Sequence, residues 1–200
     1  MKFPRRLLAA GLVLVVAVAA PALEYRIAQN HSTVGFAVPI LGGLSKVRGK
    51  FTDFAITLKF DEADLAGSSI GATIKTASID TGIADRDKHL RSADFFDAEK
   101  IPALVFQSTR IEGKDGHYVM HGTFTMHGVS KEVALPFAVT GRKFSEGKKG
   151  KLVNAGFSLR AMLNRRDYGM VWEHNAVADF VGDEIEVEID VITKATPVAP

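Results

Sequence analysis

The chain has 200 residues and no cysteine, which excludes a disulfide, a thiolate nucleophile and a cysteine-bound zinc or iron–sulfur cluster. Its 25 lysines and arginines nearly balance 23 acidic residues, and nothing in this balance indicates a nucleic-acid partner. The length is that of one domain, large enough to bury a hydrophobic core.

The N-terminus has the layout of a secretory signal peptide. Three basic residues precede an uninterrupted run of apolar or small residues from Leu7 to Ala20. Crossing a bilayer takes about 20 apolar residues, so a stable membrane anchor is the weaker interpretation. Small residues around Pro21 favour cleavage after Ala22. We therefore expect residues 1–22 to be removed and the mature protein to be periplasmic.

The rest of the chain shows alternation of apolar and polar residues, the pattern of strands with one buried face. In the segment from Glu184 to Val191, every second residue is Ile or Val and the residues between them are acidic. Such one-sided strands belong to antiparallel sheets. The same alternation recurs around Val34–Val38, Phe54–Phe60, Ile70–Ile74, Leu104–Phe106, Tyr118–Met126, Val133–Val139 and Val153–Leu159.

Turn-forming residues separate these segments, including a charged stretch from Gly141 to Lys151 that we interpret as a loop. The pattern predicts an all-β fold, an antiparallel β-barrel of about eight strands. We expect one domain over residues 23–193 and a flexible tail, rich in Pro and Ala, over residues 194–200.

One short helical segment is expected before the strand at Leu104. Asp80 or Thr81 can cap its N-terminus, Ser92 can begin a further short turn, and Pro102 ends the segment.

Six histidines raise the question of a metal site. His117 and His121 lie four residues apart on a predicted strand, so about 13 Å separates them, too far to share one ion. The chain has no His-Glu-x-x-His motif, and it has no Gly-x-Ser-x-Gly turn between a predicted strand and a helix. We therefore expect no metal, no cofactor and no enzymatic activity. A catalytic role would require a buried acid, such as Asp80 or Asp167, with a strongly raised pKa.

The chain has thirteen phenylalanines against three tyrosines and one tryptophan. Many of them fall on the inward side of the predicted strands. Alternation alone leaves open whether they fill the barrel or surround a cavity. The residues on this side are Phe36, Phe54, Phe60, Phe106, Phe124, Phe137 and Phe157.

Five motifs resemble the YceI-like family of periplasmic proteins that bind polyisoprenoids and other lipids. They occur in the family's order and span nearly the whole mature chain. The most specific one joins Ser78-Ile79-Asp80-Thr81 to the run from Arg86 to Asp97, which contains His-Leu-Arg-Ser followed by Asp-Phe-Phe-Asp. The others are Tyr25-Arg26-Ile27 with His31-Ser32, Lys46 to Phe51, Gly128 to Lys131, and Asn164 to Gly169.

The resemblance implies a lipocalin-like barrel that encloses a long isoprenoid or similar lipid, with the helical segment covering it. The predicted apolar cavity residues are Phe36, Val38, Phe54, Leu90, Phe95, Phe106, Phe124, Phe137 and Phe157. The predicted residues at the mouth or the lipid headgroup are His89, Arg91, Arg165, Asp167 and Tyr168.

Two alternatives stay open. Arg165 or Arg166 can instead pair with Asp167 and stabilise a turn. The protein can also be an exported stress-response or interaction protein whose barrel is packed and whose loops act, above all Ser145–Lys151. A homodimer is compatible with either function.

Overall fold

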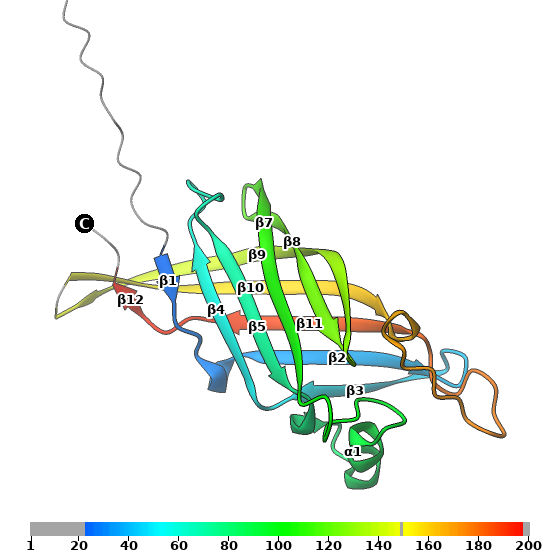
Figure 1. Cartoon of the computed structure of the whole chain (residues 1–200). Coiled ribbons are helices and arrows are strands. Elements are labelled where there is room, and N and C mark those ends of the chain that lie inside the picture. Colours follow the sequence, from blue (N-terminus) through cyan, green and yellow to red (C-terminus); the bar gives the residue numbers. More distant parts are fainter. Residues whose placement is uncertain (1–22, 149, 198–200) are drawn as a thin grey trace, which may run out of the picture.

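The computed structural model describes residues 23–148 and 150–197. The predicted signal peptide lies outside these residues. Twelve strands form a single antiparallel sheet, as the alternation predicted, and the all-β, barrel-like fold is confirmed (Figure 1). The strands are β1 (Leu23–Tyr25), β2 (Thr33–Ile40), β3 (Ser45–Phe51), β4 (Phe54–Phe60), β5 (Ser69–Lys75), β6 (Ile79–Asp80), β7 (Ala103–Lys114), β8 (His117–Met126), β9 (Val129–Gly147), β10 (Gly150–Asn164), β11 (Glu184–Ile192) and β12 (Thr196–Pro197).

A sharp bend in one strand lets the sheet curl round on itself. β3 pairs with β2, and after two residues the chain continues as β4, which pairs with β5. Backbone hydrogen bonds hold the corner, from Thr52 N to Ser78 O at 3.1 Å and from Lys75 N to Asp53 O at 2.9 Å. The sheet has twelve strands where about eight were predicted; the additional ones include the short strands β1, β6 and β12 and the division of one bent strand into β3 and β4.

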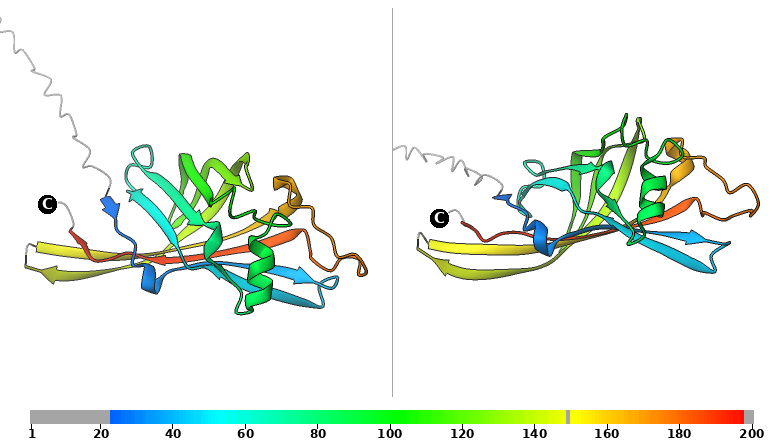
Figure 2. Two further views of the ribbon diagram at one scale, coloured as in Figure 1. Left: turned by 60° about the horizontal axis from the view of Figure 1, so that its bottom comes forward. Right: turned by 90° about the horizontal axis from the view of Figure 1, so that it is seen from below.

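The two walls of this curled sheet differ in direction. Strands β9, β10 and β11 run nearly straight along the molecule, and β4, β5, β7 and β8 cross over them (Figure 2). Helix α1 (Ala84–Arg91) lies outside the sheet, near the end where β2 and β3 meet in a hairpin. In the part of the chain that the structure describes, three short 3-10 helices connect strands: η1 (Gln29–His31), η2 (Thr76–Ser78) and η3 (Arg165–Tyr168).

The predicted charged loop from Gly141 to Lys151 is wrong. β9 continues to Gly147 and β10 begins at Gly150, so the two strands extend beyond the barrel as a paired arm (Figure 1). Most of the arm's residues are exposed, including Phe144 on β9. Both faces of the arm meet water, so the sequence carries no alternation there to signal a strand. The part of the tail predicted as flexible that the structure describes also pairs, because β12 joins β10 at Leu152 and Val153.

The predicted caps of α1 are wrong as well. No side chain of the preceding residues accepts a hydrogen bond from the first turn at Ala84. Instead, the buried carboxylate of Asp87 accepts two hydrogen bonds from Thr81, from N at 2.9 Å and from Oγ1 at 2.5 Å. Asp80 Oδ1 accepts from Gly82 N at 2.9 Å and so stabilises the preceding turn. Within residues 23–148 and 150–197, no helix has the length and apolar character needed to cross a membrane.

One end of the barrel is filled by aromatic rings, which we call the aromatic plug: Tyr25, Phe60, Tyr118, Phe137 and Phe157. The ring of Phe60 lies at its centre, 5.0 Å from Tyr118, 5.6 Å from Phe137 and 5.9 Å from Phe157, in edge-to-face contacts. Such pairs stabilise a core beyond the effect of area alone. The inward phenylalanines therefore fill this end of the barrel.

A polar cluster closes the same end. Tyr118 Oη donates to Glu62 Oε1 at 2.7 Å, and Arg142 lies 2.8 Å from Glu62 Oε2. Burial raises the pKa of Glu62, but the hydrogen bonds from Tyr118 and Arg142 outweigh it, and the pKa lies below its usual value.

A candidate lipid-binding cavity

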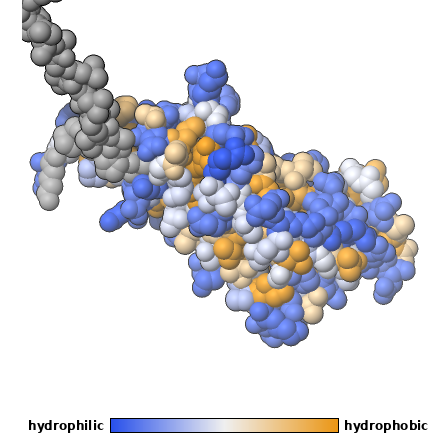
Figure 3. Space-filling view, turned by 45° about the horizontal axis from the view of Figure 1, so that its top comes forward, coloured by the Kyte–Doolittle hydropathy of each residue, from blue (hydrophilic) through white to orange (hydrophobic). Residues whose placement is uncertain are grey.

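Beyond the aromatic plug the barrel is hollow. A cavity of about 380 Å³ lies between the two walls of the sheet, within the size range of small-ligand sites. Alternation creates its lining, because successive side chains of a strand point to opposite faces. On β11, for example, Ile185, Val187, Ile189 and Val191 face the cavity, and the acidic residues between them face water. On the face of the molecule shown in Figure 3, most residues are hydrophilic and the hydrophobic ones lie in separate patches.

The aromatic plug forms the floor of the cavity. Phe137 and Phe157 belong to the plug and also line the cavity, so ligand space ends there. From the floor, the lining follows β10 outward through Leu159, Ala161 and Leu163. The cavity is therefore closed at one end and lengthens along β10.

Three segments that are distant in sequence meet at the other end, which we call the mouth. α1 contributes His89 and Leu90, and the β2–β3 hairpin contributes Ile40 and Val47. The third segment is the irregular loop between η3 and β11, which we call the mouth loop (residues 170–183). It contributes Met170, Trp172, Phe180 and Val181.

The single tryptophan of the chain lies at this mouth and was not among the predicted site residues. The ring of Trp172 lies 5.2 Å from His89 and 5.2 Å from Phe95, and His89 and Phe95 are 5.0 Å apart. The only signal in the sequence was a lone tryptophan with other apolar residues in a segment without alternation. It did not show which element the loop would cover.

Eight of the nine predicted apolar residues line the cavity, and Phe54 does not. Phe54 is the first residue of β4, next to the corner, and is buried in a cluster with Ile74 and Leu104. Ile56 and Leu58, on the same side of β4, do line the cavity, so Phe54 is packed behind the lining where the strand begins. The eight lining residues are Phe36, Val38, Leu90, Phe95, Phe106, Phe124, Phe137 and Phe157. Their contact with a ligand stays a prediction.

The predicted headgroup residues are dispersed. His89 lines the mouth, with Nε2 2.8 Å from Asp94 Oδ2. Arg91 is outside the lining and donates through Nη1 to Ile79 O at 3.3 Å. Asp167 lies at the surface in an ion pair with Lys131 at 3.1 Å.

Tyr168 is also outside the lining and is buried behind it, with its ring 5.6 Å from that of Phe124. Burial, reinforced by Asp167, raises the pKa of the Tyr168 phenol. Tyr168 therefore supports the wall of the cavity from outside.

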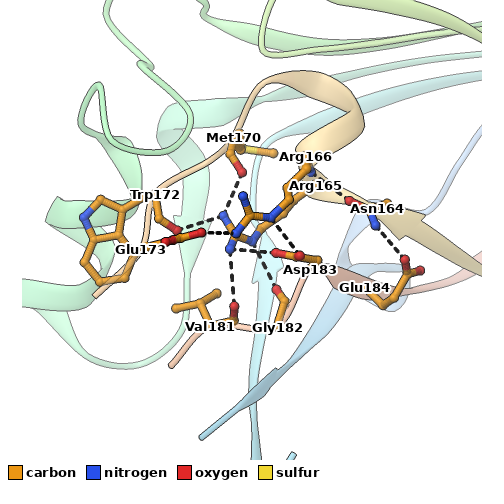
Figure 4. A network of polar contacts seen from close by, with 10 residues as sticks. All are labelled: Asn164, Arg165, Arg166, Met170, Trp172, Glu173, Val181, Gly182, Asp183 and Glu184. Atoms are coloured by element: carbon orange, nitrogen blue, oxygen red, sulfur yellow. Dashed lines mark hydrogen bonds and ion pairs between the residues drawn. The ribbon is translucent and has the colours of Figure 1, made fainter. Parts of the chain in front are cut away.

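Arg165 lies against the cavity, but its guanidinium is fully occupied (Figure 4). Nε donates to Gly182 O at 3.1 Å, Nη1 to Met170 O at 2.7 Å and Trp172 O at 3.0 Å, and Nη2 to Val181 O at 3.3 Å. The ion pair from Nη2 to Asp183 at 2.8 Å uses the last of its five N–H donors. Burial lowers the pKa of Arg165, and Asp183 opposes this shift.

This network fixes the mouth loop over the barrel. Arg166 pairs with Asp183 at 2.7 Å and with Glu173 at 2.5 Å, and Asn164 Nδ2 donates to Glu184 Oε1 at 2.8 Å (Figure 4). The expectation that Arg165 or Arg166 pairs with Asp167 is therefore wrong in its partner, although both arginines do stabilise a turn.

No group of three or more His, Asp or Glu side chains is placed to hold a metal ion within the described residues. His117 and His121 both lie on β8, as predicted. His121 Nε2 lies 2.8 Å from Glu112 Oε1.

The fold and this cavity can be compared with known proteins. The family model described as "YceI-like domain" matches residues 25–193. The chain belongs to the YceI-like family. This YceI-like chain is 38% identical over 164 residues to a UPF0312 protein of Photorhabdus laumondii. The aligned region covers 80% of this chain and 83% of that protein.

Solved structures show the same fold for this YceI-like domain. BcnA of Burkholderia cenocepacia superimposes with a TM-score of 0.72 at 22% identity, over 84% of this chain and 99% of that one. A domain of Saccharophagus degradans, described as polyisoprenoid-binding and implicated in plant cell wall breakdown, superimposes with a TM-score of 0.64 at 11% identity. That match covers 87% of this chain and 99% of the other. At sequence identities of 22% and 11%, these similarities show a shared fold and no more.

Proposed function

We propose that the protein binds a long apolar lipid of the isoprenoid type inside its barrel and carries, stores or senses it in the periplasm. The observation that carries this proposal is a cavity with an almost wholly apolar lining, closed by the aromatic plug and open at the mouth. A long apolar chain is expelled from water and would be stabilised in such a space. The description of the S. degradans domain as polyisoprenoid-binding supports the ligand class. The predicted signal peptide supports the compartment.

The proposed role is binding, with no chemical step. The lining contains no Asp or Glu, and Arg86, His89 and Arg165 are its ionisable side chains. The alternative function required a packed barrel that acts through its loops. The cavity contradicts the packed barrel, and the segment Ser145–Lys151 belongs largely to the paired strands of the arm.

A chain-length series tests the proposal. Each five-carbon isoprene unit that enters the cavity should add about 1.5 kcal/mol, at roughly 0.3 kcal/mol per heavy atom. Affinity measured by native mass spectrometry with prenyl alcohols of 10, 15, 20 and more carbons should therefore rise steeply and then level off. A flat series would refute the proposal. The same spectra report stoichiometry, and with it whether the protein forms the homodimer that the sequence left open.

The compartment has its own test. N-terminal sequencing of the protein purified from a periplasmic extract should begin at Leu23. A protein that retains residues 1–22 in the cytoplasm would contradict the export.

A further inference from the structure

The mouth holds one arginine whose charge is not balanced as that of Arg165 is. Arg86 lies on α1, three and four residues before His89 and Leu90, so the three residues share one face of the helix. All three line the cavity. Arg86 therefore belongs to the polar rim of an otherwise apolar site.

The hydrogen bonds of Arg86 hold its side chain in place but leave part of it unused. Nε donates to Thr81 Oγ1 at 2.7 Å, and Nη2 donates to Thr81 O at 2.8 Å. Within residues 23–148 and 150–197, Nη1 has no hydrogen-bond partner and no carboxylate forms an ion pair with Arg86. The nearby carboxylate of Asp87 is directed to Thr81 instead, and accepts both of its donors. A fixed guanidinium with free donors is thus present at the mouth.

The electrostatics of the cavity favour an anion at this position. The lining has no acidic residue, and Asp183 neutralises its other arginine, Arg165. A positive charge beside apolar walls is screened less than one in open water, so it attracts an acceptor or an anion more strongly. A guanidinium also keeps its charge at all relevant pH values and offers paired donors to an oxyanion.

We propose that Arg86 binds the polar end of the lipid and that this end is anionic, a phosphate or a carboxylate on an apolar chain. This inference rests on the proposed function, since it needs the chain to occupy the cavity. It moves the headgroup role from Arg91 and Arg165, where the sequence had suggested it, to Arg86. Arg86 thereby determines which end of the lipid faces the mouth and which lipids are preferred.

The test compares ligands with the same C20 prenyl chain and different ends: the monophosphate, the carboxylic acid and the neutral alcohol. Trp172 is the only tryptophan in the chain and lines the mouth, so its fluorescence can report each titration. We expect the wild-type protein to bind both anionic ligands at least tenfold more tightly than the alcohol. Inorganic phosphate alone should not bind at millimolar concentration, which separates a lipid headgroup from a site for free phosphate.

The variant Arg86→Gln should reduce this preference to less than threefold, because it weakens the binding of the two anionic ligands more than that of the alcohol. Lys88→Gln is the matched control, because Lys88 is an exposed cation on the same helix and lies outside the lining. It removes the same charge and should keep the preference. Arg86→Lys retains the positive charge without the paired donors of a guanidinium and should keep part of the preference for anionic ligands. If Arg86→Gln fails to fold, Arg86→Lys therefore tests the role of Arg86.

The outcomes separate the two proposals. If all three C20 ligands bind equally well to the wild-type protein, or if Arg86→Gln keeps the full preference, the role of Arg86 is refuted while lipid binding stands. If no ligand binds at any chain length, the proposed function fails, and the role of Arg86 fails with it.

Discussion

Replacing Ala161 by Phe should shorten the cavity from within. Ala161 lines the cavity on β10, between Leu159 near the floor and Leu163 near the mouth, and lies opposite Val187 on β11. The larger side chain adds about six carbon atoms in space that the ligand would otherwise occupy. At roughly 0.3 kcal/mol per displaced ligand atom, a chain that fills the cavity loses about 1.8 kcal/mol, close to a 20-fold loss of affinity.

The loss should depend on chain length. Short prenyl alcohols that do not need this space should bind as in the wild-type protein, and the rise of affinity with length should level off earlier. Trp172 fluorescence and native mass spectrometry measure both effects on the same samples. The matched control is Ala138→Phe on β9, because Ala138 follows Phe137 and so points to the outer face of the same barrel.

The melting temperature decides between a blocked cavity and a damaged fold. The Ala161→Phe variant fills empty space, so its stability should stay close to that of the wild-type protein. The reasoning is refuted if the longest chains bind Ala161→Phe, Ala138→Phe and the wild-type protein equally well, because the cavity would then not be the ligand site.

Three further changes test the structure around the cavity. Arg165→Met should destabilise the protein by about 3 kcal/mol in urea unfolding, because it removes one of the two arginines that pair with Asp183 and leaves four buried or partly buried carbonyls without their donor. Arg91→Met loses one long hydrogen bond and should cost less than about 1 kcal/mol. Equal losses would contradict the fully bonded role of Arg165. Phe60→Ala should cost about 3–5 kcal/mol and deepen the cavity floor, so the optimum of the chain-length series should move to longer chains; an unchanged optimum would show that the plug does not end the ligand space. The pKa of Glu62 is lowered in the folded state, so its contribution to stability is present above the pKa of the unfolded chain, about 4.5, and is lost as the pH falls through the folded value. Wild type should therefore lose its stability advantage over Glu62→Gln on acidification from pH 6 to pH 3, and a constant difference over this range would contradict the assignment.

The strands and their inward faces could be predicted from the sequence because alternation is a local property. A residue such as Val187 or Phe157 faces inward wherever its strand lies in the sheet, so most of the predicted cavity residues do line the cavity. The motifs around His89 and Asn164 indicated the family, which the comparison confirmed.

Long-range contacts decided the rest. Whether the phenylalanines fill the barrel depends on how far Phe60 on β4 lies from Phe157 on β10, and only the closed sheet sets that distance. The partner of Arg165 is Asp183, eighteen positions away, because the mouth loop folds back over η3. Phe54 lies outside the lining because it is packed behind Ile74 and Leu104 at the start of β4, and the arm of β9 and β10 carries no alternation because both its faces meet water. Local pattern thus determined which side of each strand is apolar, and tertiary packing determined where those sides enclose a space and which polar groups remain free at its mouth.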